Sequence, residues 1–118
     1  MELKVVSTDA DCTSIKTVGR IAPETSLADN EPLAKMAGPE VYGRCVLLDL
    51  SDSDFISSNG VGWLLMCHKR CSDAGGKLVV HSMPKLVQNV LKVLKLEQVL
   101  VLARDEVEAR RLAHEERP

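Results

Sequence analysis

The sequence predicts a single α/β domain, with a mixed, mostly parallel sheet packed with helices and an antiparallel hairpin at the N-terminus. The chain has 118 residues, which is close to the usual size of one domain. From Cys45 onward, strand patterns alternate with helix patterns, as expected for right-handed crossovers between parallel strands. Before that point, two short apolar segments flank a polar turn, as in a hairpin. We therefore expect residues 1–118 to form one domain around one core.

The hairpin is predicted from Val5-Val6 and Thr13–Val18, which are separated by a polar stretch. The following segment, Ile21–Gly43, contains three prolines and two glycines, which break any long helix. One short helical candidate remains, around Leu33–Met36. This segment is the part of the chain whose structure the sequence predicts least.

Three strands are expected in the second part of the chain. Cys45–Leu50 is an apolar run that ends in a polar cluster, which is typical of a central strand buried on both faces. Lys77–Val80 and Val99–Leu102 predict the next two strands.

Three helices are expected between and after these strands. The first, Gly60–Ala74, follows N-cap residues at 57–59 and should pack on the sheet through Val61, Leu64, Leu65 and His68. The second is opened by Ser82 and Pro84 and carries Leu86, Val90, Val93 and Leu94 on one face. The third begins with a pair resembling a capping box, Asp105 and Glu108, and carries Val107, Ala109, Leu112 and Ala113. An ion pair between Glu106 and Arg110 should add a few tenths of a kcal/mol to this last helix.

Composition and charge exclude several classes of function. The net charge is -2, with 15 basic and 17 acidic residues, so no broad positive field is available for nucleic acid. Lys85, Lys92 and Lys95 indicate a solvated helix face. No apolar run approaches the roughly 18 residues of a membrane span. We expect a cytoplasmic protein with no nucleic-acid partner and no direct membrane insertion.

The four cysteines, Cys12, Cys45, Cys67 and Cys71, are expected to stay reduced as thiols. Cys67, His68 and Cys71 lie on one predicted helix and could in principle bind a soft metal. No fourth ligand is evident, and small buried side chains explain these residues better. No partner base is evident for a catalytic cysteine. We therefore expect no metal, no cofactor and no enzymatic activity.

The informative region is the junction after the buried strand, Ser51–Gly62, where small hydroxyl side chains precede a helix. The free N–H groups and the positive dipole end of a helix start can hold a phosphate. A serine at this point is therefore a candidate phosphoacceptor. The alternative is that Ser57 or Ser58 only caps the helix.

This junction and the elements after it resemble the STAS domain family, named for sulfate transporters and anti-sigma factor antagonists. The resemblance covers roughly residues 44–113. It rests on an ordered set of segments: Val46–Leu50, Ser57–Gly62, Ala74–Val80 and Pro84–Leu94. At three positions the sequence differs from the family pattern: Ser57 replaces an acidic residue, Asn59 replaces a Ser or Ala, and Lys95 stands where a helix C-terminal Gly is common.

The resemblance implies a non-enzymatic switch of the anti-sigma factor antagonist type. The family's unphosphorylated protein binds a serine kinase that doubles as an anti-sigma factor, and so frees the sigma factor. The phosphoacceptor of the family corresponds by position to Ser58 here, with Ser57 as the fallback.

Two other functions are weighed against the switch. Within the family, the alternative is an accessory subunit of a lipid-transporting ABC system or of a stress-signalling assembly, with an ATPase or a scaffold as partner and no phosphorylation cycle. Outside the family, Asp49 with Asp9 and Asp11 imitates the carboxylate cluster of a response-regulator receiver. That function needs a Lys after a late strand, where this chain has Ala103-Arg104.

The expected partner contacts surround Ser58. On a helical wheel, Trp63, Met66 and Arg70 fall opposite the predicted core stripe and should face outward. Trp and Arg dominate binding hot spots, so this group is a candidate interface anchor. Asp52, Asp54 and Asn59 are the other expected contacts. The alternative is that a neighbouring segment, such as Ile21–Gly43, covers Trp63.

Overall fold

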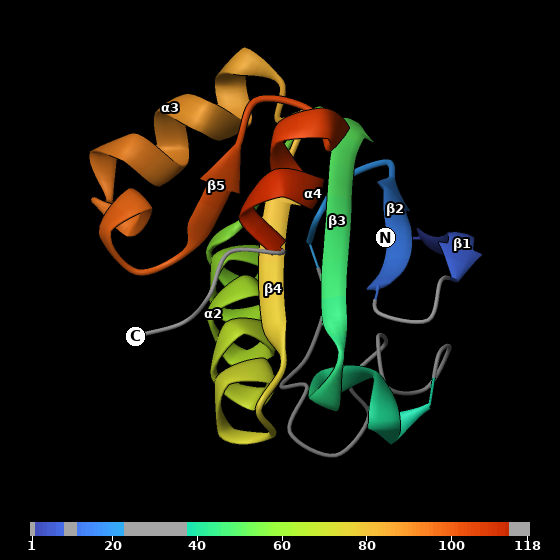
Figure 1. Cartoon of the computed structure of the whole chain (residues 1–118). Helices are drawn as coiled ribbons and strands as arrows, with labels where there is room; N and C mark the ends of the chain where they lie inside the picture. Colours follow the sequence, from blue (N-terminus) through green and yellow to red (C-terminus); the bar gives the residue numbers. More distant parts are fainter. Residues whose placement is uncertain (1, 9–11, 23–37, 114–118) are drawn as a thin grey trace.

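A computed structural model describes residues 2–8, 12–22 and 38–113 of the chain, as a five-stranded sheet with helices on both faces (Figure 1). The strand order is β1-β2-β3-β4-β5. β1 (Glu2–Thr8) is antiparallel to β2 (Cys12–Val18), and the other neighbouring strands are parallel. The predicted fold class and N-terminal hairpin are confirmed, whereas the helical candidate at Leu33–Met36 lies outside the described residues.

The centre of the sheet is β3 (Cys45–Asp52), between β2 and β4 (Lys77–His81). Leu48 points to one face of the sheet and Leu47 to the other, and neither is exposed to solvent. The continuous apolar run in this strand therefore reflects burial on both faces, as predicted. The short strand β5 (Val101–Ala103) forms the edge beyond β4.

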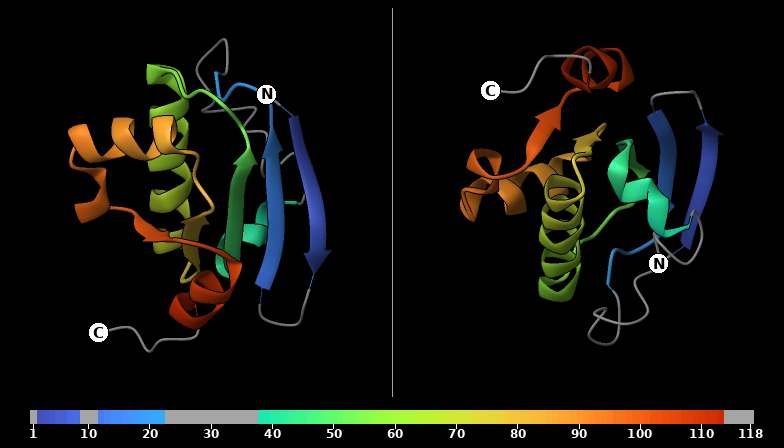
Figure 2. Two further views of the ribbon diagram at one scale, coloured as in Figure 1. Left: turned by 90° about the horizontal axis from the view of Figure 1, so that it is seen from above. Right: turned by 60° about the horizontal axis from the view of Figure 1, so that its bottom comes forward.

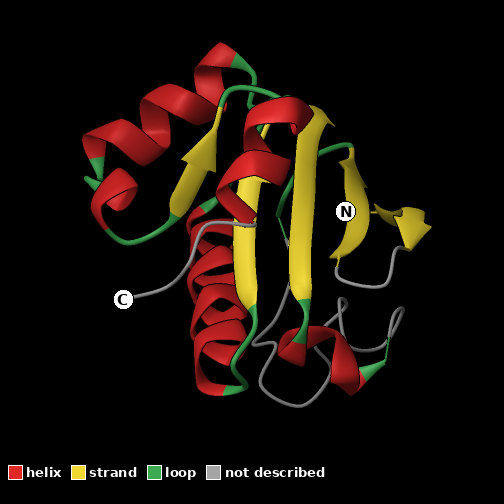
Figure 3. Cartoon of the chain, in the orientation of Figure 1, coloured by secondary structure: helices red, strands yellow, loops and turns green. Residues whose placement is uncertain are grey.

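Helices cover the two faces of the sheet unequally (Figures 2 and 3). On one face lie α2, α3 and a 3-10 turn, η1, which contribute to one buried cluster; their bounds are Ser58–Asp73, Lys85–Val93 and Pro39–Gly43. On the other face lies α4 (Glu106–Ala113), which buries Ala109 against Leu47 and Val79. A second 3-10 turn, η2 (Leu96–Gln98), leads from α3 to β5.

The core face of α2 differs from the predicted one. Trp63 is 1% exposed and lies in the main core cluster, so the expectation that it faces outward is wrong. Val41 and Tyr42 of η1 belong to the same cluster as Trp63, and the Arg70 guanidinium lies 5.8 Å from the Tyr42 ring centroid. Part of the segment that the sequence left unassigned thus covers this flank of α2. The helix buries the following residues: Gly60, Trp63, Leu64, Cys67 and Cys71.

The opposite flank of α2 and the outer side of α3 are less enclosed. Of the expected packing residues of α2, Leu64 is fully buried, and Val61, Leu65 and His68 are half-buried. In α3, Val87 and Leu91 enter the core. The predicted apolar face of that helix is largely solvent-exposed: Leu86 is 52%, Val93 79% and Leu94 52% exposed.

Lys95, just after α3, has the left-handed backbone conformation, with φ 58° and ψ 31°. This is the position where the family resemblance points to Gly. A residue with a Cβ in this conformation costs roughly 1 kcal/mol relative to glycine. The expected departure at Lys95 is thus a real source of backbone strain.

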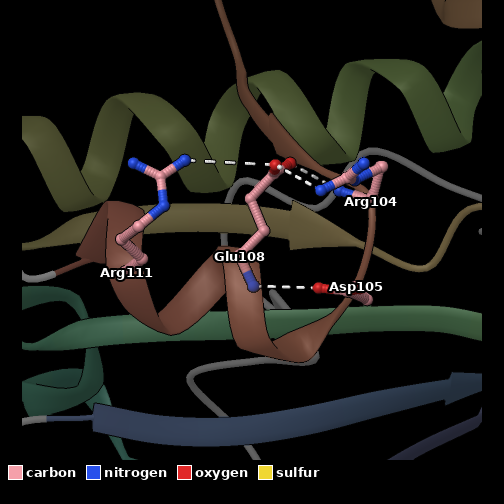
Figure 4. A network of polar contacts seen from close by, with 4 residues as sticks. All are labelled: Arg104, Asp105, Glu108 and Arg111. Atoms are coloured by element: carbon pink, nitrogen blue, oxygen red, sulfur yellow. Dashed lines mark hydrogen bonds and ion pairs between the residues drawn. The ribbon is translucent and has the colours of Figure 1, made fainter.

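The start of α4 carries the predicted cap (Figure 4). The Glu108 N–H donates to Asp105 Oδ1 at 2.9 Å, and the Glu108 carboxylate accepts from the Arg104 N–H, also at 2.9 Å. That carboxylate lies between the guanidinium groups of Arg104 and Arg111, at 3.5 and 4.0 Å. The pair Arg110 and Glu106 is present as predicted, at 3.2 Å.

Candidate partner-binding site

The junction between β3 and α2 is held against the segment that follows β2. The Gly19 N–H donates to the Asp52 carbonyl at 3.0 Å, and the Ile21 N–H donates to the Phe55 carbonyl at 2.8 Å. The Ser57 N–H then donates to the Ile21 carbonyl at 3.0 Å. These bonds continue the pairing of β2 with β3 beyond the strands, so the backbone before α2 is fixed in position.

Ser57 is the N-cap of α2. Its Oγ accepts from the Gly60 N–H at 3.1 Å and donates to the Ile21 carbonyl at 3.3 Å, and its own carbonyl accepts from the Val61 N–H at 2.9 Å. A capping hydroxyl satisfies one of the orphan N–H groups of the first turn. The helix therefore begins at Ser58, two residues earlier than predicted.

Ser58 and Asn59 are the first two residues of α2, and both are exposed. The Ser58 hydroxyl therefore projects from the positive end of a 16-residue helix. A phosphate attached there would sit where helix N–H groups and the helix dipole favour negative charge. Ser58 thus offers an exposed hydroxyl at the first position of α2.

Oppositely charged groups surround this end of the domain. Lys16 Nζ lies 3.1 Å from Asp52 Oδ2, and that hydrogen bond and charge raise the pKa of Lys16. Asp54 is exposed. The Arg20 guanidinium stacks 4.5 Å from the Phe55 ring centroid, a cation–π contact. Sequence reasoning missed Arg20 and Phe55, although the chain's single Phe, two residues before Ser57, was an available signal.

A buried hydrogen bond holds the loop between β3 and α2 on its core side. Thr17 Oγ1 and Ser53 Oγ are 2.6 Å apart, and both residues are buried. Next to this pair, Ile21 and Ile56 form an isolated parallel bridge and belong to the core cluster. The loop that presents Asp54 and Ser58 is therefore anchored in the core on both sides.

The structure divides the predicted contact set into three groups. Asp52 ends β3, Asp54 lies in the loop that follows, and Ser58 and Asn59 begin α2; all four are exposed. Met66 and Arg70 are half-buried on the η1 flank, and Met66 lies roughly 12 Å further along the helix axis. Trp63 lies beneath the surface and can only support it.

The described residues give little support to the other sites considered from the sequence, a metal site and a receiver-like carboxylate cluster. Cys67 and Cys71 are packed in the core, and within 2–8, 12–22 and 38–113 no group of three or more His, Cys, Asp or Glu could hold a metal. Asp49 accepts from the Ser51 N–H at 2.8 Å, while Asp9 and Asp11 lie outside the described residues. Among the described helices, none is long and apolar enough to cross a membrane.

A family model described as the Mlab STAS domain matches residues 5–103. The chain belongs to the STAS family. Solved structures of STAS proteins have the same fold. An anti-sigma factor antagonist domain protein from Planctomyces limnophilus is 23% identical, with coverage of 96% of this chain and 98% of that one and a TM-score of 0.72.

Two further structures agree with this STAS assignment. An anti-sigma factor antagonist from Mycobacterium paratuberculosis is 14% identical, with coverage of 97% and 96% and a TM-score of 0.69. The anti-sigma factor antagonist SpoIIAA in its unphosphorylated form is 15% identical, with coverage of 98% and 100% and a TM-score of 0.69. No curated protein sequence matches the chain. At these identities the likeness establishes the fold, and the family comes from the domain match.

Proposed function

We propose that this STAS protein is an anti-sigma factor antagonist that binds a serine-kinase anti-sigma factor while Ser58 is unphosphorylated, and is released when Ser58 is phosphorylated. The proposed activity is binding, without catalysis and without a cofactor. The observation that carries the proposal is the division of roles between two neighbouring serines. The Ser57 hydroxyl is engaged as the helix cap, whereas Ser58 is exposed at the helix start.

Charge supplies the mechanism of release. A phosphoserine carries about -1.5 to -2 charges at pH 7. The start of α2 accommodates this charge internally, so the fold survives the modification. On the outer surface the phosphate adds to Asp52 and Asp54, both exposed. A partner site shaped for a hydroxyl beside carboxylates then meets like-charge repulsion.

The proposed contact surface consists of the loop residues and the exposed part of α2. Asp52, Asp54 and Asn59 would form its centre beside Ser58, and Met66 and Arg70 its edge. Trp63 would act from beneath, by holding α2 on the sheet.

A second candidate is a STAS accessory subunit that holds its partner without a phosphorylation cycle. In support of it, the matching family model is described as that of Mlab and not as that of a sigma-factor regulator. Its partner would be an ABC transporter ATPase or a signalling scaffold.

The test is phosphorylation by serine-kinase-like proteins encoded beside this chain, with mass spectrometry to map the site. Phosphate should appear at Ser58 and disappear in Ser58→Ala, but persist in Ser72→Ala, a matched control because Ser72 is exposed at the other end of α2. Ser58→Asp should bind the kinase at least about tenfold more weakly than wild type. Phosphate at Ser57 alone, or undiminished binding by Ser58→Asp, would remove Ser58 from this role. Stable binding without phosphorylation would favour the accessory subunit.

A further inference from the structure

The outer flank of α3 presents an apolar strip to solvent. Leu86, Val93 and the C-cap residue Leu94 lie on one side of the helix at 100° per residue, with the half-buried Val90 among them. Val87 and Leu91 already anchor α3, so this strip is not needed to attach the helix to the sheet. Exposed apolar residues gathered on one helix side mark an interaction surface more often than scattered ones do.

The strip lies on the same side of the sheet as the first turns of α2. Because Arg70 and Tyr42 fix η1 on one flank of α2, the other flank, with Val61 and Leu65, is turned away from η1. α3 lies on that other side, beyond β4 (Figures 1 and 2). We name these residues the α2–α3 surface: Val61, Leu65, Leu86, Val90, Val93 and Leu94.

The charged side chains of α3 itself are lysines, and Glu97 follows two residues after Lys95. No Asp or Glu occurs in residues 74–96, whereas Lys85, Lys92 and Lys95 are all exposed. The polar side of α3, with Gln88, Asn89 and Lys92, lines a cleft of about 370 Å³ toward β5 and α4, whose other charged lining residues are Glu97, Arg104 and Glu108. At 100° per residue, Lys85 and Lys92 lie beyond Leu86 and Val93 on the side away from the core residues Val87 and Leu91, so lysines lie next to the apolar strip.

We propose that the α2–α3 surface binds an amphipathic helix of the partner protein, whose apolar side packs on the strip and whose acidic edge faces the lysines. Such a helix would present apolar residues at i, i+3, i+4 and i+7. The inference rests on the proposed function, because it names the part of the partner that would lie beside Ser58. It also explains release, because a phosphate at the start of α2 would repel an acidic helix packed along its first turns.

The test uses two capped, fluorescein-labelled peptides of about 16 residues that share one leucine face. One carries Glu along the edges of that face, and the other carries Lys at the same positions. In anisotropy titrations the Glu peptide should bind at least about tenfold more tightly than the Lys peptide. Its affinity should fall as NaCl rises from about 50 to about 500 mM.

A matched pair of variants locates the site. Val93→Glu should lower the affinity for the Glu peptide by about tenfold or more. Val107→Glu should leave its affinity unchanged, because Val107 is 81% exposed on α4, across the sheet. Failure of the Glu peptide to bind, equal affinity for both peptides, or equal loss from the two variants would overturn the proposal. So would Val93-dependent binding to vesicles of anionic lipid, or Val93-dependent self-association, in the absence of peptide binding.

This experiment distinguishes failure of the helix-binding surface from failure of the phosphorylation switch. Ser58→Asp should lower the affinity for the Glu peptide several-fold. If Ser58→Asp binds the peptide like wild type while Val93→Glu does not, the helix-binding surface stands and the phosphorylation switch falls. If a kinase phosphorylates Ser58 and is released, but neither peptide binds, the switch stands and the helix-binding surface falls.

Discussion

Gly60, in the first turn of α2, packs directly on the carbonyl of Ile21. A Cβ built on Gly60 would lie far inside van der Waals contact with that oxygen, and 2.9 Å from Cγ1 of Ile56. The Ile21 carbonyl oxygen also accepts a hydrogen bond from the N–H of Ser57, the N-cap residue. The same oxygen therefore contacts Gly60 and holds the cap of α2. The start of α2 is therefore seated on the segment after β2 by backbone contact, and only glycine fits at this point.

Gly60→Ala should destabilise the domain. The added methyl group would push α2 away from Ile21, and overpacking of this kind costs about 1–3 kcal/mol. Gly62→Ala is the control, because nothing lies within 4 Å of its Cβ position, and it should stabilise the helix by roughly 0.5–1 kcal/mol. Urea unfolding of both variants measures the difference. Equal stability of the two variants would contradict the packing described.

Ser57→Ala and Ser58→Ala should affect stability differently. Removing the Ser57 hydroxyl leaves the Gly60 N–H without its cap and should lower the free energy of unfolding by about 1 kcal/mol. Ser58 is exposed, so its removal should change that free energy by less than about 0.5 kcal/mol. Thermal unfolding of the two variants compares them. A larger loss from Ser58→Ala would show that Ser58 has a structural role.

Trp63→Ala should cause a large loss of stability, of about 3–5 kcal/mol, because it empties a fully buried site. Lys69→Ala, on the exposed side of the same helix, should have little effect. Any loss of partner binding by Trp63→Ala would then follow from misplacement of α2. A well-folded Trp63→Ala variant with unchanged unfolding temperature would contradict the burial.

His81 should make stability depend on pH. It is 1% exposed; its Nδ1 lies 2.8 Å from Ser82 Oγ, and within the described part of the chain its Nε2 has no hydrogen-bond partner. Burial lowers its pKa from 6.5, although the neighbouring Asp49 and Glu106 oppose this. The unfolded chain therefore binds more protons, so this contribution is fully present above about pH 6.5 and is lost as pH falls below it.

The comparison is between wild type and His81→Gln. The stability advantage of wild type should shrink between about pH 7.5 and about pH 5.5, with a slope of at most about 1.4 kcal/mol per pH unit. Urea unfolding across this range measures the slope. A pH-independent difference between the two proteins would show that His81 titrates equally in the folded and unfolded chains.

The predictable part of the site is its local chemistry. A buried apolar run at Cys45–Leu50, followed by serines and a helical pattern, placed Ser58 at a helix start because capping and strand burial depend on residues close in sequence. The partners of that junction were not predictable. Ile21 is more than thirty residues away from Ser57 along the chain and meets it only because β2 and β3 pair.

The amino-acid sequence by itself determined the element types, the central strand, the hairpin and the cap of α4, since each follows from a local period or a short-range hydrogen bond. It also indicated which side chains share a helix face. The tertiary structure decided which faces are covered: Trp63 is buried in the main core cluster, which Val41 and Tyr42 of η1 also join, and Val93 is exposed because Val87 and Leu91 take the core side of α3. Periodicity defines faces, but only the neighbours brought together by folding determine which of them meets water.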